Sequence, residues 1–330
     1  MYDPWRSKEA AFALRAVANA TTLADHIQKS LVTPALTKGD RSPVTVADYA
    51  VQAAIGHWLG KEFPGDVMVG EEQAAELREP GGEETLRQVT RFLKTIIPAA
   101  GEEDVCAWID RGAGKPGGRF WTLDPVDGTK GYLRGEQWAV ALALVVDGRV
   151  RLGVLGCPNL VDGYRAEFKG PGSVLIAEAG KGAWVRSIAG GQFKPLAVSK
   201  QKLSAEARVL RSVESGHTNV GAMDDLVAAL GTKAEPVLMD SQAKYAVLAA
   251  GQGDLYFRLL SSGKSDYREK IWDQAAGSLI VEEAGGRVTD LDGKPLDFSK
   301  GRTLAANRGL VASNGHLHNA ALAAIKKIRA

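Results

Sequence analysis

Cysteine is scarce in this sequence, since Cys106 and Cys157 are the only two among 330 residues. They lie far apart and no CxxC pair occurs, which argues against a disulfide framework and against a structural zinc site built on paired cysteines. Sparse cysteine usage of this kind fits a reducing compartment. We therefore expect a cytoplasmic protein.

A dominant charge of one sign is also missing. The 41 Lys and Arg residues nearly balance the 39 Asp and Glu residues, the formal net charge is +2, and no long basic block occurs. Proteins that bind nucleic-acid polymers usually present a basic stripe to the phosphate backbone. We therefore expect a small-molecule partner and no nucleic acid.

Long hydrophobic runs are absent as well. The longest, Trp138 to Val146, is far shorter than the roughly 20 apolar residues that span a bilayer. Charged residues such as Asp3, Arg6 and Lys8 interrupt the N-terminus, where a secretory signal needs an unbroken apolar core. We expect no membrane partner, and we further expect a monomer.

The chain is longer than a single hydrophobic core usually grows, so we expect two domains, residues 1–195 and 196–330. In the first, apolar spacing predicts a long helix that ends before Pro34 and a second helix after Thr45. The segments FWTLDPV, WAVALALVV and RVRLGVL then predict an antiparallel sheet, with a hairpin turn at Asp147-Gly148. In the second, helical stretches alternate with short strands, which is typical of an α/β layer domain.

The densest chemical signal is the segment DPVDGT at residues 124–129, which follows a predicted strand. Pro125 fixes its φ and Gly128 permits unusual dihedral angles, so the carboxylates of Asp124 and Asp127 can be held on one side. Carboxylates this close repel unless a cation lies between them. Magnesium prefers such oxygen ligands, and the Val126 carbonyl would add another. Taken alone, the two aspartates are equally well explained as a turn cap and a helix cap.

Two further acidic sites favour the metal interpretation. Glu71 and Glu72 follow the apolar run VMV, where only one of them can face a given site, and Asp273 precedes the predicted helix QAAGSLIVEEAGG. A helix N-terminus offers backbone N–H groups to a phosphate, so a metal ion and an anion would meet there. The alternatives are a solvated glutamate pair and a plain N-cap at Asp273.

The string DPVDGTKGYLRGEQWAVALAL, the GEE pair and WDQAAG resemble the lithium-sensitive, magnesium-dependent phosphatase superfamily that includes inositol monophosphatase. More narrowly, GTKGYLRGEQ, GCPNL, VESGH, DSQAKY and YREKIWD resemble its 3'(2'),5'-bisphosphate nucleotidase branch, over about residues 43–298. The resemblance implies an αβαβα sandwich of the α/β (α+β) class. It also implies an antiparallel N-terminal sheet, a mixed C-terminal sheet and Mg2+ in the cleft between layers.

The resemblance also assigns roles to residues of this chain. In the metal-binding N-terminal domain it implies that Asp48, paired with Thr129, activates the attacking water. It places Glu72 around the metal site but not among the direct ligands. In the nucleotide-binding C-terminal domain it implies adenine packing on His217 and a grip on the 5'-phosphate by Arg258. The implied metal ligands are Glu71, Asp124, the Val126 carbonyl, Asp127 and Asp273, and the implied further substrate contacts are Thr129, Ser241, Lys244 and Asp273.

The implied reaction removes the 3'-phosphate from 3'-phosphoadenosine 5'-phosphate, with 3'-phosphoadenylyl sulfate as a second candidate substrate. In the branch this activity clears an inhibitory by-product of sulfur assimilation. A phosphate monoester is dianionic and repels hydroxide, so cations must neutralise the phosphoryl oxygens and lower the pKa of the water. No covalent intermediate is needed, in line with the lack of HExxH, GxSxG and P-loop motifs.

The sequence departs from the branch in two places. TNV follows VESGH where branch members usually carry Ser and His, and Gln274 stands where His is common. Selectivity for the base and the 5'-group is therefore less defined than catalysis. Two alternatives stay open: an inositol-phosphate phosphatase, against which the nucleotide strings argue, and a catalytically silent nucleotide sensor, against which the intact acidic set argues.

Overall fold

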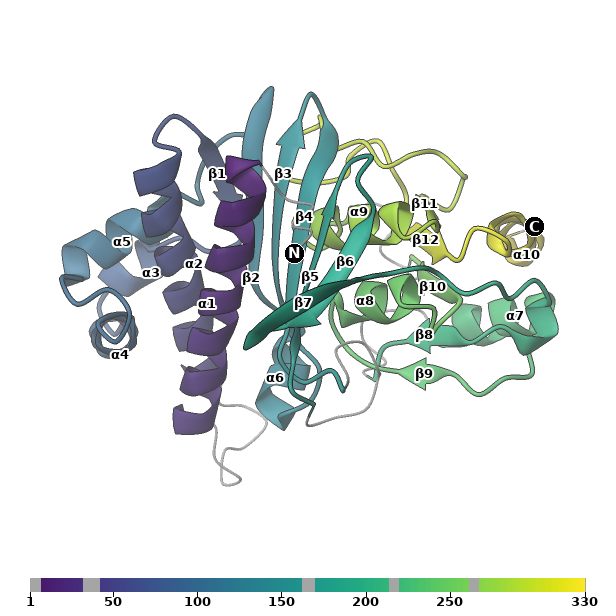
Figure 1. The fold of residues 1–330 in the computed structure, drawn as a ribbon, viewed down its shortest axis with the longest axis horizontal. Helices are drawn as coiled ribbons and strands as arrows, with labels where there is room; N and C mark the ends of the chain where they lie inside the picture. The colour runs from purple at the N-terminus through teal and green to yellow at the C-terminus, as the bar shows by residue number, and fades with distance from the viewer. Residues whose placement is uncertain (1–6, 32–41, 162–169, 214–219, 261–266, 330) are drawn as a thin grey trace.

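The computed structural model describes residues 7–31, 42–161, 170–213, 220–260 and 267–329. Its elements stack in the order helix, sheet, helix, sheet, helix, from the purple N-terminal helix to the yellow C-terminal helix in Figure 1. Each layer presents an apolar face to the next, because a sheet with two apolar faces needs cover on both sides. The predicted αβαβα sandwich is confirmed.

The first sheet has seven strands in the order β1 to β7. The predicted antiparallel pairing is confirmed for β2 to β7, whereas β1 joins the edge of the sheet parallel to β2. The expected hairpin turn is confirmed: Asp147 and Gly148 adopt φ of 51° and 71°, the left-handed conformation of tight hairpins. The strands are β1 (Val67–Gly70), β2 (Arg119–Asp127), β3 (Ala139–Val146), β4 (Arg149–Cys157), β5 (Ser173–Glu178), β6 (Ala183–Ser187) and β7 (Gly190–Pro195).

Helices cover the outer face of this sheet. The long predicted helix is α1 (Lys8–Leu31), and Phe12 on it packs edge-on against Trp121 of β2, with ring centroids 5.4 Å apart. The second helix, α2, spans Ser42–Glu62 and so begins three residues before Thr45, the residue after which we expected it. The remaining helices of this half are α3 (Ala75–Arg78), α4 (Glu83–Leu93), α5 (Glu102–Asp110) and α6 (Thr129–Arg134).

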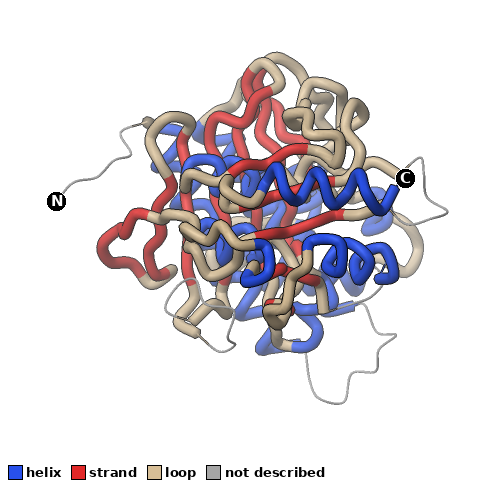
Figure 2. Tube along the Cα trace, turned by 90° about the vertical axis from the view of Figure 1, so that its right-hand side faces the viewer, coloured by secondary structure: helices blue, strands red, loops and turns tan. Residues whose placement is uncertain are grey.

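The second sheet is mixed, as predicted, with the strand order β11-β12-β10-β8-β9. Its strands are β8 (Val209–Arg211), β9 (Val237–Leu238), β10 (Leu255–Arg258), β11 (Arg287–Thr289) and β12 (Leu310–Ser313), and a 3-10 turn, η1, spans Ser204–Glu206. Helices α7 (Val220–Leu230) and α10 (His318–Arg329) cover its outer face, which points toward the viewer in Figure 2.

Two helices, α8 (Ala243–Ala249) and α9 (Ala275–Glu283), form the middle layer between the sheets. Close packing requires glycine here: a Cβ on Gly153 of β4 would lie 2.7 Å from the Ala276 carbonyl oxygen. The first sheet ends at Pro195, yet these later helices pack on it. The division into domains 1–195 and 196–330 therefore stays a prediction.

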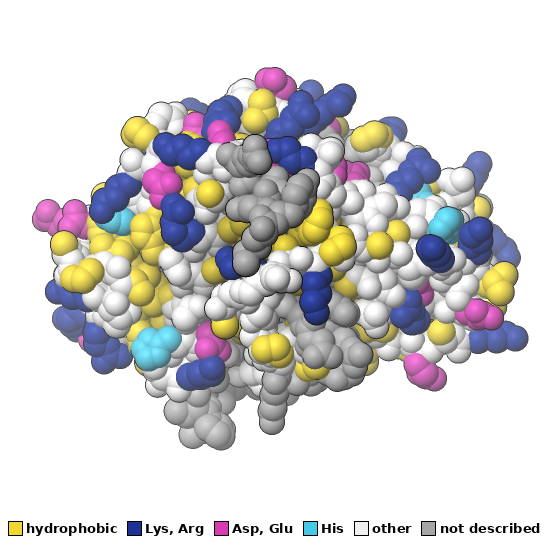
Figure 3. Space-filling model, in the orientation of Figure 1, with side chains coloured by type: hydrophobic (Ala, Val, Ile, Leu, Met, Phe, Trp, Pro, Cys, Tyr) yellow, Lys and Arg dark blue, Asp and Glu magenta, His cyan; other side chains and the backbone are white. Residues whose placement is uncertain are grey.

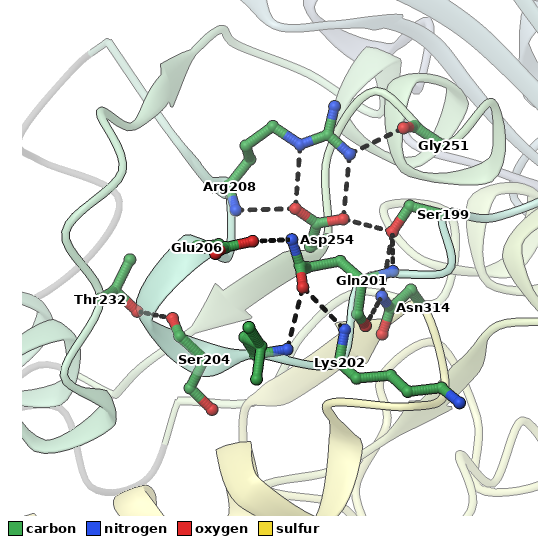
Figure 4. Close-up of polar contacts among 11 residues, drawn as sticks. Ser199, Gln201, Lys202, Ser204, Glu206, Arg208, Thr232, Gly251, Asp254 and Asn314 are labelled. Atoms are coloured by element: carbon green, nitrogen blue, oxygen red, sulfur yellow. Dashed lines mark hydrogen bonds and ion pairs between the residues drawn. The ribbon is translucent and has the colours of Figure 1, made fainter.

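A polar network fastens the segment after Pro195 to the second sheet (Figure 4). Asp254, fully buried, accepts hydrogen bonds from the Arg208 backbone N–H at 2.7 Å, from Arg208 Nε at 2.9 Å and from the Ser199 hydroxyl. Asn314 donates to Ser199 Oγ at 3.0 Å and to the Gln201 carbonyl at 2.8 Å. Because each buried polar atom here has a partner, the segment is held in one path.

Charged side chains are scattered over the face drawn in Figure 3, where Lys and Arg alternate with Asp and Glu and with uncharged surface. Within the described ranges, no helix has the length and apolarity needed to cross a membrane.

Candidate active site

A cavity of about 500 Å³ lies where the end of β2 and the start of α6 face α8, β10 and the segment before α9. Most of the predicted site residues line it: Glu71, Asp124, Val126, Asp127, Thr129, Ser241, Lys244, Arg258 and Asp273. Residues that are distant in the chain thus meet at one place. Asp48 lies behind the acidic side of this cavity, and His217 lies outside the described residues.

The DPVDGT segment is shaped by an irregularity at the end of β2. The pairing with β3 shifts between Asp124 and Asp127, and Gly128 follows with φ of 89°. A Cβ on Gly128 would lie 2.7 Å from Cβ of Ser241, so only glycine fits. Asp127 Oδ2 accepts a hydrogen bond from the Gln242 backbone N–H at 2.6 Å. The residue that caps α6 is Gly128, so the helix-cap explanation of Asp127 is wrong.

The acidic side of the cavity is a group of mutually repelling carboxylates. Asp124 is only 3% exposed, and its Oδ1 has no hydrogen-bond partner among the described residues. Burial, together with the neighbouring carboxylates, holds the pKa of Asp124 well above its usual range. In order of effect, those neighbours are Glu71, Asp127, Asp273 and Asp48. A bound cation would lower the pKa of Asp124 again, because it favours the ionised carboxylate.

Two cationic side chains, Lys244 and Arg258, also line the cavity. Lys244 is 2% exposed and donates to the Met239 carbonyl at 3.3 Å, and burial lowers its pKa to about 8. Ser241 adopts φ of 67°, which is rare for a residue with a side chain, and its hydroxyl accepts from the Ala243 backbone N–H at 3.1 Å. Such a held conformation is typical of functional loops.

Arg258 reaches the cavity from the end of β10 and is held by a carboxylate. Its Nε lies 3.3 and 3.2 Å from the two oxygens of Glu269, and Nη2 lies 2.9 Å from Oε2. Gln274 donates to the same Glu269 oxygen at 2.9 Å and accepts from the Tyr245 hydroxyl. This side-on pairing with Glu269 uses two of the five guanidinium N–H groups, and Tyr267 forms a further side-chain hydrogen bond with Arg258.

Asp48 lies in α2, where burial, Glu72 and Glu71 together raise its pKa well above the usual range. Burial and the Glu71 charge likewise raise the pKa of Glu72 to about 7. Within the part of the chain that the structure describes, no hydrogen bond joins Asp48 to Thr129. The predicted pairing of these two residues therefore stays a prediction.

The fold and the cavity together match one family. Residues 5–330 match the inositol monophosphatase family. The chain belongs to this family. Curated relatives named 3'(2'),5'-bisphosphate nucleotidase include one from Oryza sativa, 42% identical over 337 aligned positions that cover 96% of this chain and 93% of the relative. Another, from Schizosaccharomyces pombe, is 40% identical and is covered to 91%, with 92% of this chain aligned.

Solved structures of the family share this fold at lower identity. The inositol monophosphatase (IMPase) of Thermotoga maritima aligns with a TM-score of 0.65 at 21% identity, over 98% of each chain. CysQ from Bacteroides thetaiotaomicron aligns with a TM-score of 0.61 at 19% identity, over 95% of this chain and 99% of the other. At these identities the likeness shows the fold alone.

Membership of the family implies dependence on a divalent metal ion, and the residues fit such an ion in kind. Asp124 offers a buried, unpartnered oxygen, and carboxylates are the ligands that hard divalent cations prefer. Among the described residues, no group of three or more Asp, Glu, His or Cys side chains has the arrangement of a preformed site for one ion. Individual ligands are therefore not assigned by geometry.

Several residues of the site were missed by sequence reasoning. Asp240 is buried, forms an ion pair with Arg134 and accepts from the Val213 backbone N–H at 3.2 Å. Glu269 holds Arg258 as described above. Both lie inside strings that carry the resemblance, DSQAKY and YREKIWD, which contained the available signal.

Proposed function

We propose that this phosphatase is a magnesium-dependent 3'(2'),5'-bisphosphate nucleotidase. Its substrate is 3'-phosphoadenosine 5'-phosphate, which it converts to AMP and phosphate, with 3'-phosphoadenylyl sulfate as a second candidate. The observation that carries the proposal is a single cavity lined both by a group of carboxylates and by Arg258 and Lys244. A substrate with one phosphate to be hydrolysed and a second to be bound suits this combination of charges. The relatives at about 40% identity support the same substrate class.

The acidic side would hold the metal. Glu71, Asp124, the Val126 carbonyl, Asp127 and Asp273 are the proposed ligands. When bound, Mg2+ would neutralise phosphoryl oxygens and lower the pKa of the attacking water. The Gln242 backbone N–H fixes the orientation of Asp127 through the bond at 2.6 Å. Preorganised groups of this kind need no rearrangement as charge develops.

Asp48 and Thr129 are the proposed partners of the attacking water. A carboxylate whose pKa is raised by burial is a better proton acceptor at neutral pH, and Asp48 has such a pKa. Thr129 is the first residue of α6 and lines the cavity, which supports a role for its hydroxyl in this step. The proposed proton path runs from water to the Asp48 carboxylate.

The cationic side would select the nucleotide. Arg258 has three N–H groups that Glu269 does not use, and a guanidinium binds phosphate oxygens in pairs. Ser241 and Lys244 line the same cavity as Arg258. The proposed adenine contact, His217, lies outside the described residues.

Two alternatives make different demands on the cavity. The first is an inositol (poly)phosphate phosphatase. An inositol monophosphate would leave Arg258 and Lys244 without a second phosphate to bind, whereas an inositol polyphosphate would supply one. In a silent nucleotide sensor the buried Asp124 carboxylate would destabilise the fold without a cation and would contribute nothing to catalysis. We further propose that the enzyme is a monomer and that it is cytoplasmic. The two buried free cysteines support the second of these, because disulfides are rare in a reducing compartment.

The test is phosphate release from three substrates with and without MgCl2. We expect 3'-phosphoadenosine 5'-phosphate to be hydrolysed with a far higher kcat/KM than inositol 1-phosphate or fructose 1,6-bisphosphate, and only with Mg2+. Preference for inositol 1-phosphate would support the first alternative. Tight binding of the nucleotide with no phosphate release would support the second.

A further inference from the structure

Arg302 connects parts of the site that are far apart in the sequence. Its Nη2 donates to the carbonyl of Gly70, the residue before Glu71, and its Nη1 donates to the Gly112 carbonyl at 3.1 Å. The guanidinium also lies over the ring of Trp272, the residue before Asp273, 4.9 Å from the centroid. One side chain thus contacts the residue that precedes each of two acidic cavity residues, Glu71 and Asp273.

The backbone of the same segment is tied to the Asp273 side. The Ile271 N–H donates to the Arg302 carbonyl at 3.2 Å, and Leu304 N–H donates to the Glu269 carbonyl at 2.8 Å. Between them, Lys270 and Thr303 form an isolated antiparallel bridge. Residues 302–304 therefore move with the segment that leads into Asp273, while the Arg302 side chain binds the end of β1.

The other flank of Glu71 is fixed from α2. Gln52 lies one helical turn after Asp48 and is fully buried. Its amide donates to the Glu72 carbonyl at 2.7 Å and accepts from the Glu72 N–H at 3.0 Å. A Cβ on Gly70 would overlap this amide, so the backbone there has little room to shift. Arg302 consequently meets a carbonyl of fixed position.

We propose that Arg302 is a positioning residue that couples Glu71 to Asp273 and so sets the affinity of the site for a divalent cation. This inference rests on the metal site of the proposed function. A guanidinium suits the task because its planar fork reaches two carbonyls at once and its face stacks on an indole. A lysine in its place keeps the positive charge, yet its ammonium cannot reproduce the fork and the stacking together.

The experiment compares Mg2+ binding by wild-type protein and Arg302→Lys, measured by isothermal titration calorimetry with MgCl2 and no substrate. Groups that orient metal ligands typically alter metal affinity by about 10- to 100-fold, so we expect Arg302→Lys to weaken Mg2+ binding within that range. The matched control is Arg208→Lys. Arg208 also donates to a carbonyl, that of Gly251 at 2.8 Å, but lies in the network of Figure 4. The Arg208→Lys variant should bind Mg2+ with the affinity of the wild type.

An unchanged Mg2+ affinity in folded Arg302→Lys would overturn the inference and leave Arg302 a structural residue. Failure of the wild type itself to bind Mg2+ would instead contradict the metal site of the proposed function. If Arg302→Lys does not fold, hydrogen exchange measured on the wild type tests the coupling in its place. MgCl2 should slow exchange in residues 67–73 and 299–304 together. Protection of 67–73 with no change in 299–304 would also overturn the coupling.

Discussion

Arg258 and Glu269 form a side-on ion pair at the edge of the cavity, with Nη2 of the arginine 2.9 Å from Oε2 of the glutamate. The glutamate orients the guanidinium without using all of its donors. The pair therefore orients the proposed 5'-phosphate contact. Removing either partner would destabilise the fold, because it leaves the other as an unpaired buried charge. Substitutions here must keep a charge to be informative.

Arg258→Lys should raise the KM for 3'-phosphoadenosine 5'-phosphate by about tenfold, because an ammonium keeps the charge but loses the bidentate contact. The contact is present in both the ground state and the transition state, so kcat should change little. Steady-state kinetics check this. 3'-AMP is the control, since it lacks a 5'-phosphate and its KM should stay near the wild-type value. An equal effect on both nucleotides would remove Arg258 from the 5'-phosphate site.

Gln274→Leu should produce a milder effect of the same kind. The substitution removes the donor to Glu269 at 2.9 Å and the acceptor of the Tyr245 hydroxyl, so Glu269 no longer fixes the guanidinium. We expect a KM increase of roughly two- to fivefold for the bisphosphate alone. The double variant Gln274→Leu with Arg258→Lys should be no worse than Arg258→Lys. Full additivity would show that Gln274 acts independently of Arg258.

Asp124→Asn should abolish turnover and make the metal-free protein slightly more stable. Burial and neighbouring carboxylates raise the pKa of Asp124 in the folded protein, so its ionised form destabilises the fold at neutral pH. We expect the Tm to rise by roughly 1 to 3 °C in EDTA and to stop responding to MgCl2. Asp254→Asn is the matched control: the Asp254 carboxylate is paired with Arg208, so its loss should lower the Tm.

The affinity for substrate should fall as pH rises through about 8. Burial lowers the pKa of Lys244 to about 8, so its ammonium is charged below that pH and neutral above it. Because the substrate is anionic, KM for 3'-phosphoadenosine 5'-phosphate should increase between pH 7 and pH 9. Lys244→Arg keeps its charge throughout this range and should flatten the profile. An identical rise in that variant would assign the effect to another group.

Lithium should inhibit the enzyme at millimolar concentrations. A small monovalent ion can occupy an oxygen site built for Mg2+ but supplies half the charge needed to neutralise a phosphoryl group. Titration of LiCl at fixed MgCl2 tests this, with KCl at the same ionic strength as the control. Indifference to LiCl would count against a site of this type.

Local patterns predicted what local chemistry determines. The hairpin at Asp147-Gly148 and the acidic DPVDGT segment follow from short-range dihedral and charge rules, and both are found. The parallel pairing of β1 with β2 was not predictable in this way, because it depends on segments separated by several helices. The start of α2 lies at Ser42, three residues before the Thr45 of our prediction, because an apolar pattern determines the presence of a helix better than its ends.

The polar residues of the site also fall into two groups, those that a sequence pattern indicates and those that only the fold brings to the site. Asp240 and Glu269 lie in distinctive strings, whereas Gln52 and Arg302 show no pattern in the sequence. Arg302 contacts a carbonyl 232 positions away, and a backbone acceptor leaves no trace in residue identity. Such residues are found only once the fold has placed them.

The proposed function requires that the enzyme hydrolyses the 3'-phosphate while the 5'-phosphate is bound in the same cavity. The most direct measurement is the identity of the nucleoside product when purified enzyme acts on 3'-phosphoadenosine 5'-phosphate with MgCl2, separated by chromatography against standards. We expect 5'-AMP and one equivalent of phosphate. Accumulation of 3'-AMP, or of adenosine with two equivalents of phosphate, would contradict the proposed function.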